Sequence, residues 1–193
     1  MPPAIDWDAV HAEALDIFVR FLRIDTSNPP GNETPAAHFL GELIEAEAQR
    51  LVKERGAFRA DQFLLAGNFR AHYENTGPEF LAQSNYQVGA FCDFVGTGGS
   101  FAGCAAAFKE HDASIKCYVV EPAGAAILAG KDVTDPNHRI QGGGYSIAEL
   151  DFINHDHVDG YLQVGDEAAI NVARRLAAEE GIFAGFSSGA NVA

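Results

Sequence analysis

The stretch Gly96-Thr97-Gly98-Gly99-Ser100 decides the fold of this chain, because it joins a strand-like segment to a helix-like one. Residues 88–95 before it have the length and the aromatic and β-branched content of a buried strand. Residues 101–111 after it are typical of a helix. Free N–H groups at a helix start attract anions, and glycines let a phosphate approach the backbone closely. The stretch therefore predicts an α/β unit with a site for a phosphate group.

The composition is that of an ordinary globular protein, with 193 residues of which 47% are hydrophobic and 21% charged. A net charge of −14 argues against nucleic acid and anionic membranes as partners, because both would be repelled. The three cysteines are odd in number and widely spaced, as in reduced proteins without disulfides or a zinc site. With no leader-like segment and no long apolar run, we expect a soluble cytoplasmic protein without a metal site.

Two long helices are expected at the start of the chain. Asp6 is suited to cap a helix that runs through Leu22, with apolar residues along one face. A second helix is expected from Thr34, taken as its cap, to about residue 55. Pro35 suits its first turn, and Gly56 suits its end.

Beyond residue 56, strands and helices are expected to alternate. Such alternation is typical of a parallel sheet that is covered on both faces. The expected strands are residues 57–63 (weak or merely extended), 88–95, 114–120, 158–164 and 182–186. The expected helices are residues 78–83, 101–111, 166–180 with Asp166 as the cap, and one that opens at Ser187.

A second turn, residues 185–189, repeats the strand–turn–helix design and offers hydroxyl groups at a helix start. Both turns should lie at the carboxyl edge of the sheet, where open α/β folds bind ligands. The residues alone leave open whether either turn is more than a tight turn. They also leave open a dinucleotide fold, with Gly96-x-Gly98 followed by Glu121 at the end of the next strand. The third glycine of that pattern would fall at Phe101, whose bulk argues against it.

Several longer motifs occur in one order between residues 49 and 193. They are Glu54-Arg-Gly-Ala-Phe-Arg-Ala-Asp-Gln-Phe63, Thr76-Gly-Pro-Glu79, Val95-Gly-Thr-Gly-Gly-Ser-Phe-Ala-Gly103, Val119-Val-Glu-Pro122, Gln141-Gly-Gly-Gly-Tyr145 and Gly185-Phe-Ser-Ser-Gly-Ala190. Together they resemble the second half of the pyridoxal-phosphate (PLP) enzymes of the cysteine synthase and cystathionine β-synthase type. The resemblance implies part of a three-layer α/β/α domain with a parallel sheet, of the tryptophan synthase β-like PLP type, preceded here by two helices.

The resemblance also implies a cofactor site. Gly96, Thr97, Gly98, Gly99 and Ser100 would hold the PLP phosphate, with Ser100 in a place where the family usually has threonine. Ser187 would hydrogen-bond the pyridine nitrogen, and a neutral partner there suits β-elimination and replacement. The implied reaction is the replacement of the acetyl group of O-acetylserine by sulfide, which gives cysteine and acetate.

Two parts of the family's active site have no counterpart in this sequence. One is the lysine that forms a Schiff base with PLP, and the other is a Ser-Gly-Asn-Thr-Gly-like loop that binds the substrate carboxylate. We expect Lys53, Lys109, Lys116 and Lys131 to be solvated surface amines. The sequence therefore predicts no catalytic residue, PLP that binds non-covalently if at all, and weak or no turnover.

The first 46 residues resemble a different family, the N-terminus of the acetylornithine deacetylase and succinyl-diaminopimelate desuccinylase peptidases. That family's metal ligands come after this segment, so the resemblance carries over no site residue. We expect a helical segment over residues 1–48 and a truncated PLP-enzyme-like domain over residues 49–193. A chimera of this kind could instead be a non-enzymatic fragment that binds a phosphate ligand or a partner chain, or forms a homo-oligomer through an uncovered sheet edge.

Overall fold

The computed structural model describes residues 5–27 and 33–193, and it divides into two compact units, Met1–Arg59 and Ala60–Ala193. We describe each unit by itself. Within the described residues, no helix has the length and apolar character needed to cross a membrane.

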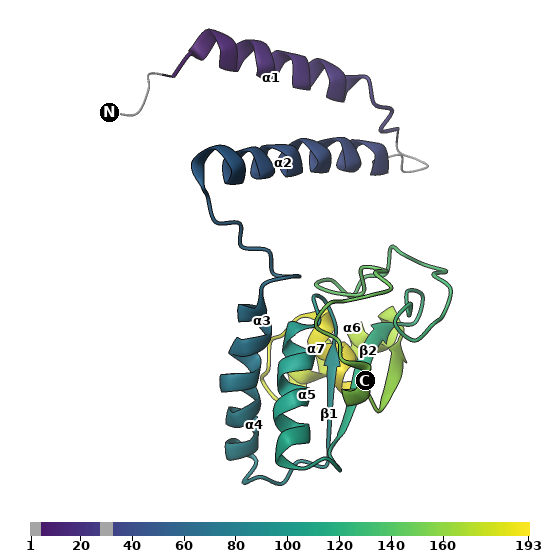
Figure 1. Cartoon of the computed structure of the whole chain (residues 1–193). Helices are drawn as coiled ribbons and strands as arrows, with labels where there is room; N and C mark the ends of the chain where they lie inside the picture. Colours follow the sequence, from purple (N-terminus) through teal and green to yellow (C-terminus); the bar gives the residue numbers. More distant parts are fainter. Residues whose placement is uncertain (1–4, 28–32) are drawn as a thin grey trace. The chain divides into compact units, whose positions relative to one another are not determined.

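The first unit consists of helices α1 (Trp7–Leu22) and α2 (Thr34–Arg55), as expected (Figure 1). Asp6 caps α1, because its carboxylate accepts a hydrogen bond from the Ala9 N–H over 3.1 Å. Gly56 ends α2 with a left-handed φ of 61°. The cap expected at Thr34 is wrong, since Thr34 is already helical and Glu33 precedes it without a side-chain cap.

Three consecutive helical segments open the second unit: α3 (Ala66–Ala71), the π-helical η1 (His72–Thr76) and α4 (Gly77–Gln83). The sequence predicted only the last of them. Gly77 lets this helical stretch approach the helix that follows the glycine turn, because a Cβ there would lie 2.7 Å from the Ala107 Cβ. The weak strand expected over residues 57–63 is absent, and these residues form turns and irregular backbone.

The sheet has three parallel strands in the order β1 (Ala90–Phe94), β2 (Lys116–Pro122) and β3 (Gly160–Val164). The parallel pairing confirms the prediction made from the alternation of strands and helices. The strand expected over residues 182–186 is wrong, because no described strand pairs with these residues and Phe183 is 97% exposed.

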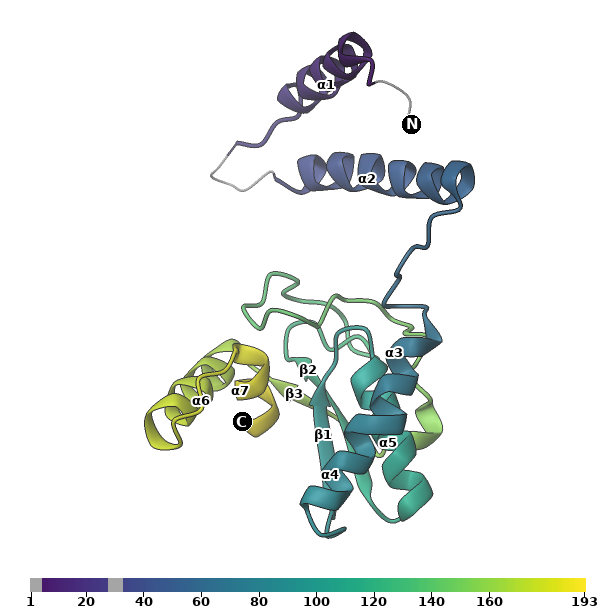
Figure 2. The ribbon, with the colours of Figure 1, turned by 90° about the vertical axis from the view of Figure 1, so that its left-hand side faces the viewer.

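Helices cover both faces of the sheet, which confirms the three-layer expectation (Figure 2). The helices α3, α4 and α5 (Gly99–His111) lie on one face, and α6 (Asp166–Glu179) and α7 (Phe186–Val192) on the other. Consecutive residues of β2 pack on opposite faces of the sheet. Val119 packs with Phe101 and Phe108, whereas Val120 packs with Ile140 and other residues on the α6 side. Asp166, the expected cap of α6, is its first helical residue.

Candidate cofactor-binding site

The glycine turn lies where the sequence places it, between the end of β1 and the start of α5. Gly98 has a φ of 85°, which L-residues rarely adopt, and it directs the chain from the strand into the helix. Gly98 and Gly99 are buried, and Gly96, Thr97 and Ser100 are half-buried.

Most backbone N–H groups of this turn have no acceptor. Among the described residues, the N–H groups of Gly96, Thr97, Gly98 and Ser100 make no hydrogen bond. The Gly99 N–H donates to the Thr97 hydroxyl oxygen over 3.4 Å. Because an unpaired N–H group away from water is costly, such a run of donors at a helix start favours an anionic acceptor.

Close neighbours explain why this turn needs glycine. A Cβ on Gly99 would lie 2.2 Å from Oδ1 of Asn68, and one on Gly96 would lie 2.6 Å from the carbonyl oxygen of Gly142. The Gly144 N–H also donates to the Val95 carbonyl over 3.0 Å. The glycine-rich loop at residues 142–144 therefore packs directly on the end of β1.

Two side chains that the sequence analysis missed hold the hydroxyl groups of the turn. Asn68 of α3 donates from Nδ2 to the Thr97 Oγ1 over 3.0 Å. The Ser100 Oγ donates to Oδ2 of Asp93 over 2.6 Å. A signal for Asp93 was present, because it is the only charged residue in the apolar segment 88–95.

Asp93 also connects the glycine turn to α7, the helix that begins within the second predicted turn. Asn191 of α7 donates from Nδ2 to Oδ1 of Asp93 over 3.5 Å, and its carbonyl accepts a hydrogen bond from the Cys92 thiol. Burial raises the pKa of the Asp93 carboxyl, and the hydrogen bonds from Ser100 and Asn191 act in the opposite direction. The structure thus brings α5 and α7 together on one carboxyl group of β1.

Ser187 lies in the first turn of α7, one residue after the helix begins. It is half-buried, and its hydroxyl has no hydrogen-bond partner among the residues that the structure describes. The helix is held tightly against α6, because a Cβ on Gly189 would lie 2.0 Å from the Ala169 carbonyl oxygen. The Ser187 hydroxyl is therefore free to bind an acceptor, on a helix whose position is fixed.

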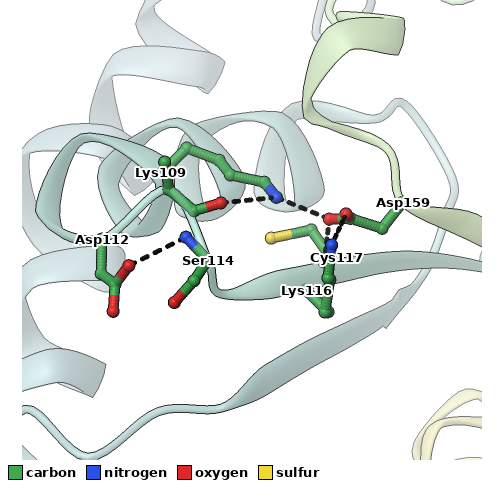
Figure 3. Close-up of polar contacts among 7 residues, drawn as sticks. Lys109, Asp112, Ser114, Lys116, Cys117 and Asp159 are labelled. Carbon is green, nitrogen blue, oxygen red and sulfur yellow. Dashed lines mark hydrogen bonds and ion pairs between the residues drawn. The ribbon is translucent and has the colours of Figure 1, made fainter.

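The expectation that Lys109 is a solvated surface amine is wrong. Lys109 and Lys116 both pair with Asp159, over 2.6 Å and 2.8 Å, and the Lys109 side chain is only 15% exposed (Figure 3). Lys109 is thus a partly buried ion-pair partner and not a solvated amine, since it lies under the segment that leads into β3. Hydrogen bonds from Lys109 and Lys116 hold the pKa of Asp159 well below its usual range.

This ion-pair cluster lies far from the glycine turn along the strands. Lys116 begins β2 and Asp159 precedes β3, whereas the turn follows the end of β1. Because all three strands are parallel, the cluster lies at the amino ends of the strands and the turn lies at their carboxyl ends. Lys131 donates to the Gln163 side chain over 2.6 Å, and Lys53 belongs to α2.

Phe101 and Glu121, the two residues that bear on a dinucleotide site, both have structural roles. Phe101 is 1% exposed and stacks on Phe91, with 6.0 Å between the ring centroids. Glu121 is buried, and its carboxylate accepts the N–H groups of Leu128 and Ala129 over 2.8 Å and 2.9 Å. This carboxylate holds the backbone of the loop after β2, and its burial keeps it away from a ribose.

All three cysteines of the chain, Cys92, Cys104 and Cys117, are free thiols. In the described part of the chain, no three His, Cys, Asp or Glu side chains gather as metal ligands would.

Comparison with known proteins places the chain in a family. Residues 37–193 match the family described as pyridoxal-phosphate dependent enzyme. The chain is 34% identical over 160 residues to cysteine synthase of Staphylococcus aureus, which covers 82% of this chain and 50% of that protein. It is 37% identical over 132 residues to cysteine synthase 3 of Caenorhabditis elegans, covering 68% of this chain and 38% of that protein.

Solved structures give the same result. A hydrogen sulfide-producing enzyme from Fusobacterium nucleatum superposes with a TM-score of 0.70 at 35% identity, covering 81% of this chain and 51% of that one. O-acetylserine sulfhydrylase isoform 3 from Entamoeba histolytica superposes with a TM-score of 0.69 at 31% identity, covering 76% and 43%. The chain spans about half the length of the curated relatives it matches first.

Proposed function

Because the chain belongs to the family of pyridoxal-phosphate dependent enzymes, we propose that its glycine turn holds the phosphate of PLP. The observation that carries this proposal is the run of backbone N–H groups at residues 96–100 without an acceptor among the described residues. The dipole of α5 adds to their attraction for a dianion.

The hydroxyl groups of the turn fit a phosphate as well. The Thr97 oxygen accepts hydrogen bonds from Asn68 and from the Gly99 N–H, so its own proton has no acceptor among the described residues. A phosphate oxygen would supply that acceptor. No basic side chain is required, which agrees with the net charge of −14.

The free hydroxyl of Ser187 would bind the pyridine nitrogen of the cofactor. When bound, PLP stabilises negative charge at the α-carbon of an amino acid, which permits a leaving group at the β-carbon to be replaced. A neutral serine does not hold the ring nitrogen protonated, so it favours this β-replacement over reactions that need a stronger electron sink. We propose O-acetylserine and sulfide as the substrates of the ancestral reaction, in keeping with the names of the relatives.

We propose further that this chain binds PLP without a covalent lysine bond and turns over weakly or not at all. Lys109 and Lys116 form ion pairs with Asp159 at the amino ends of the strands, whereas the turn lies at the carboxyl ends. The Ser-Gly-Asn-Thr-Gly-like substrate loop has no counterpart in the sequence. We therefore expect this chain to bind the cofactor and to catalyse the reaction weakly or not at all.

A second candidate function is a phosphate-binding or partner-binding fragment. It is favoured by the exposed apolar side chains before and within α7, among them Phe183 at 97% and Ile182 at 53% exposed. In this reading the chain associates through uncovered surface, with a homo-oligomer as the simplest product. We also propose that residues 1–46 derive from the peptidase family and that the boundary between the two parts lies at residues 48 and 49. A cytoplasmic location is proposed as well.

One experiment tests the cofactor proposal and the covalent question together. The full chain is dialysed against PLP, the retained cofactor is measured, and half of the sample is reduced with borohydride before peptide mass spectrometry. We expect saturable retention of PLP and no stoichiometric lysine adduct. No retention would refute the cofactor site, and a stoichiometric adduct on one lysine would refute non-covalent binding.

A further inference from the structure

The Ser100 hydroxyl has a single proton, and two groups require it. In the structure it donates that proton to Asp93 over 2.6 Å. In the proposed function, on which this inference rests, Ser100 lies beside the cofactor phosphate. A carboxylate and a phosphate dianion both accept hydrogen bonds and donate none. With both anions present, one of them would face Ser100 without a hydrogen bond.

Burial shifts Asp93 toward its neutral form, against the effect of the hydrogen bonds from Ser100 and Asn191. The side chain is half-buried, and burial raises the pKa of its carboxyl. A phosphate in the adjacent turn would place a second negative charge nearby, which raises a carboxyl pKa further. On the other side, Asn191 donates to Oδ1, so Oδ2 is the oxygen that faces Ser100.

We propose that Asp93 is a positioning residue that takes up a proton from solvent when a phosphate group binds in the glycine turn. Its carboxylic acid then donates from Oδ2 to the Ser100 oxygen, and the Ser100 proton turns to the phosphate. One solvent proton becomes the O–H of Asp93, and no other bond is made or broken. Oδ1 continues to accept from Asn191.

The other titratable groups that interact with Asp93 come from three elements. His72 of η1 would lower the pKa of Asp93 if it carried a charge. Cys104 of α5 and Cys92 of β1 have thiol pKa values that burial raises, to about 12 for Cys104, so both stay neutral near physiological pH. On α7 no side chain titrates, and Val119 lies opposite Asp93 on β2. His72 is thus the one competing group to control.

The test is calorimetric titration of the full chain in buffers of different ionisation enthalpy, which counts the protons taken up per ligand bound. The ligands are PLP and inorganic phosphate, each at about pH 8, where phosphate is mostly dianionic and an ordinary carboxyl is ionised. The variants are Asp93→Asn, Ser100→Ala and His72→Gln, with the exposed Asp156→Asn as the matched control. Thermal unfolding without ligand shows that each variant folds.

The wild-type chain and the Asp156→Asn and His72→Gln variants should take up close to one proton more than Asp93→Asn does. Asp93→Asn should bind at least as tightly as wild type, because its amide donates to Ser100 without a proton from solvent. Above the pKa of Asp93, wild-type affinity should fall by up to about tenfold per pH unit relative to this variant. Ser100→Ala should bind more weakly and lose the extra proton.

The outcomes separate this inference from the proposed function. Equal proton counts in wild type and Asp93→Asn, with PLP bound, would overturn the inference and leave the function standing. Uptake of the extra proton with inorganic phosphate but no binding of PLP would support the inference and refute the function. Binding of neither ligand would refute both. Loss of the extra proton in His72→Gln would assign the proton to His72 and overturn the role of Asp93.

Discussion

The side-chain amide of Asn68 donates to the Thr97 hydroxyl over 3.0 Å and to the Gln62 carbonyl over 2.7 Å. Both of its N–H bonds are thus directed, one to the glycine turn and one to the segment that leads into α3. This arrangement orients the Thr97 hydroxyl so that its own proton is available to an anion.

Replacing Asn68 should therefore weaken cofactor binding without unfolding the chain. We expect Asn68→Ala to raise the dissociation constant of PLP about fivefold to tenfold, the size of one net hydrogen bond. Fluorescence titration with PLP measures it. The matched control is Asn75→Ala, whose amide, among the described residues, donates only to the Ala71 carbonyl within the same helical stretch. An equal loss in both variants would contradict the role given to Asn68.

Gly99→Ala tests the close contact directly. The added methyl group would lie 2.2 Å from the Asn68 Oδ1, so Asn68 must move and its hydrogen bond to Thr97 must break. We expect PLP binding to weaken at least as much as in Asn68→Ala. The double variant should bind better than Gly99→Ala alone, because the collision is then gone. Gly67→Ala is the control, since nothing lies within 4 Å of the added atom. Additive losses in the double variant would argue against the steric account.

The sequence predicts the part of the site that depends on local pattern. A strand, a glycine turn and a helix follow one another at residues 88–111, so the position of Gly98 and the start of α5 could be inferred. The hydrogen bond between Asn68 and Thr97 could not, because it joins residues 29 apart in sequence through a helix that the prediction missed. Gly67, Gly77 and the π-helical segment His72–Thr76 hide the helical period of that stretch.

The wrong strand at residues 182–186 has a different cause. A short apolar run satisfies the pattern of a buried strand, but a strand also needs a neighbour to pair with. In the part of the chain that the structure describes, the sheet ends at β1 and β3, and Phe183 remains 97% exposed. Whether residues 182–186 form a strand depends on a neighbouring strand, and a local sequence pattern does not show whether one is present. The same holds for Lys109, which is partly buried and pairs with Asp159, 50 residues away.

Gly189→Ala should destabilise the second unit, because the new Cβ would lie 2.0 Å from the backbone oxygen of Ala169. Backbone yields less easily than a side chain, so we expect a loss of about 2–3 kcal/mol in the free energy of unfolding. Chemical denaturation measures it. Gly165→Ala is the control, because its added atom meets nothing within 4 Å and its φ is negative. A change below about 0.5 kcal/mol in Gly189→Ala would contradict the close packing of α7 on α6.

Acid should weaken the second unit through Asp159. Its pKa is lowered in the folded state, so its ion pairs contribute stability above the pKa of the unfolded carboxyl. That contribution is lost as the pH falls through the range between the unfolded and folded pKa values. Asp159→Asn should therefore lower the melting temperature near neutral pH and flatten its decline in acid. The control is Asp156→Asn, and parallel curves for all three proteins would contradict the assignment.

The most direct test of the central claim compares PLP with pyridoxal, which lacks only the phosphate, in equilibrium titrations of the full chain. If residues 96–100 hold the phosphate, PLP should bind at least about tenfold more tightly, since charge-assisted hydrogen bonds to several N–H groups are lost with pyridoxal. The preference should shrink in Gly99→Ala. Equal affinity for the two compounds, or a preference that Gly99→Ala leaves intact, would contradict the account.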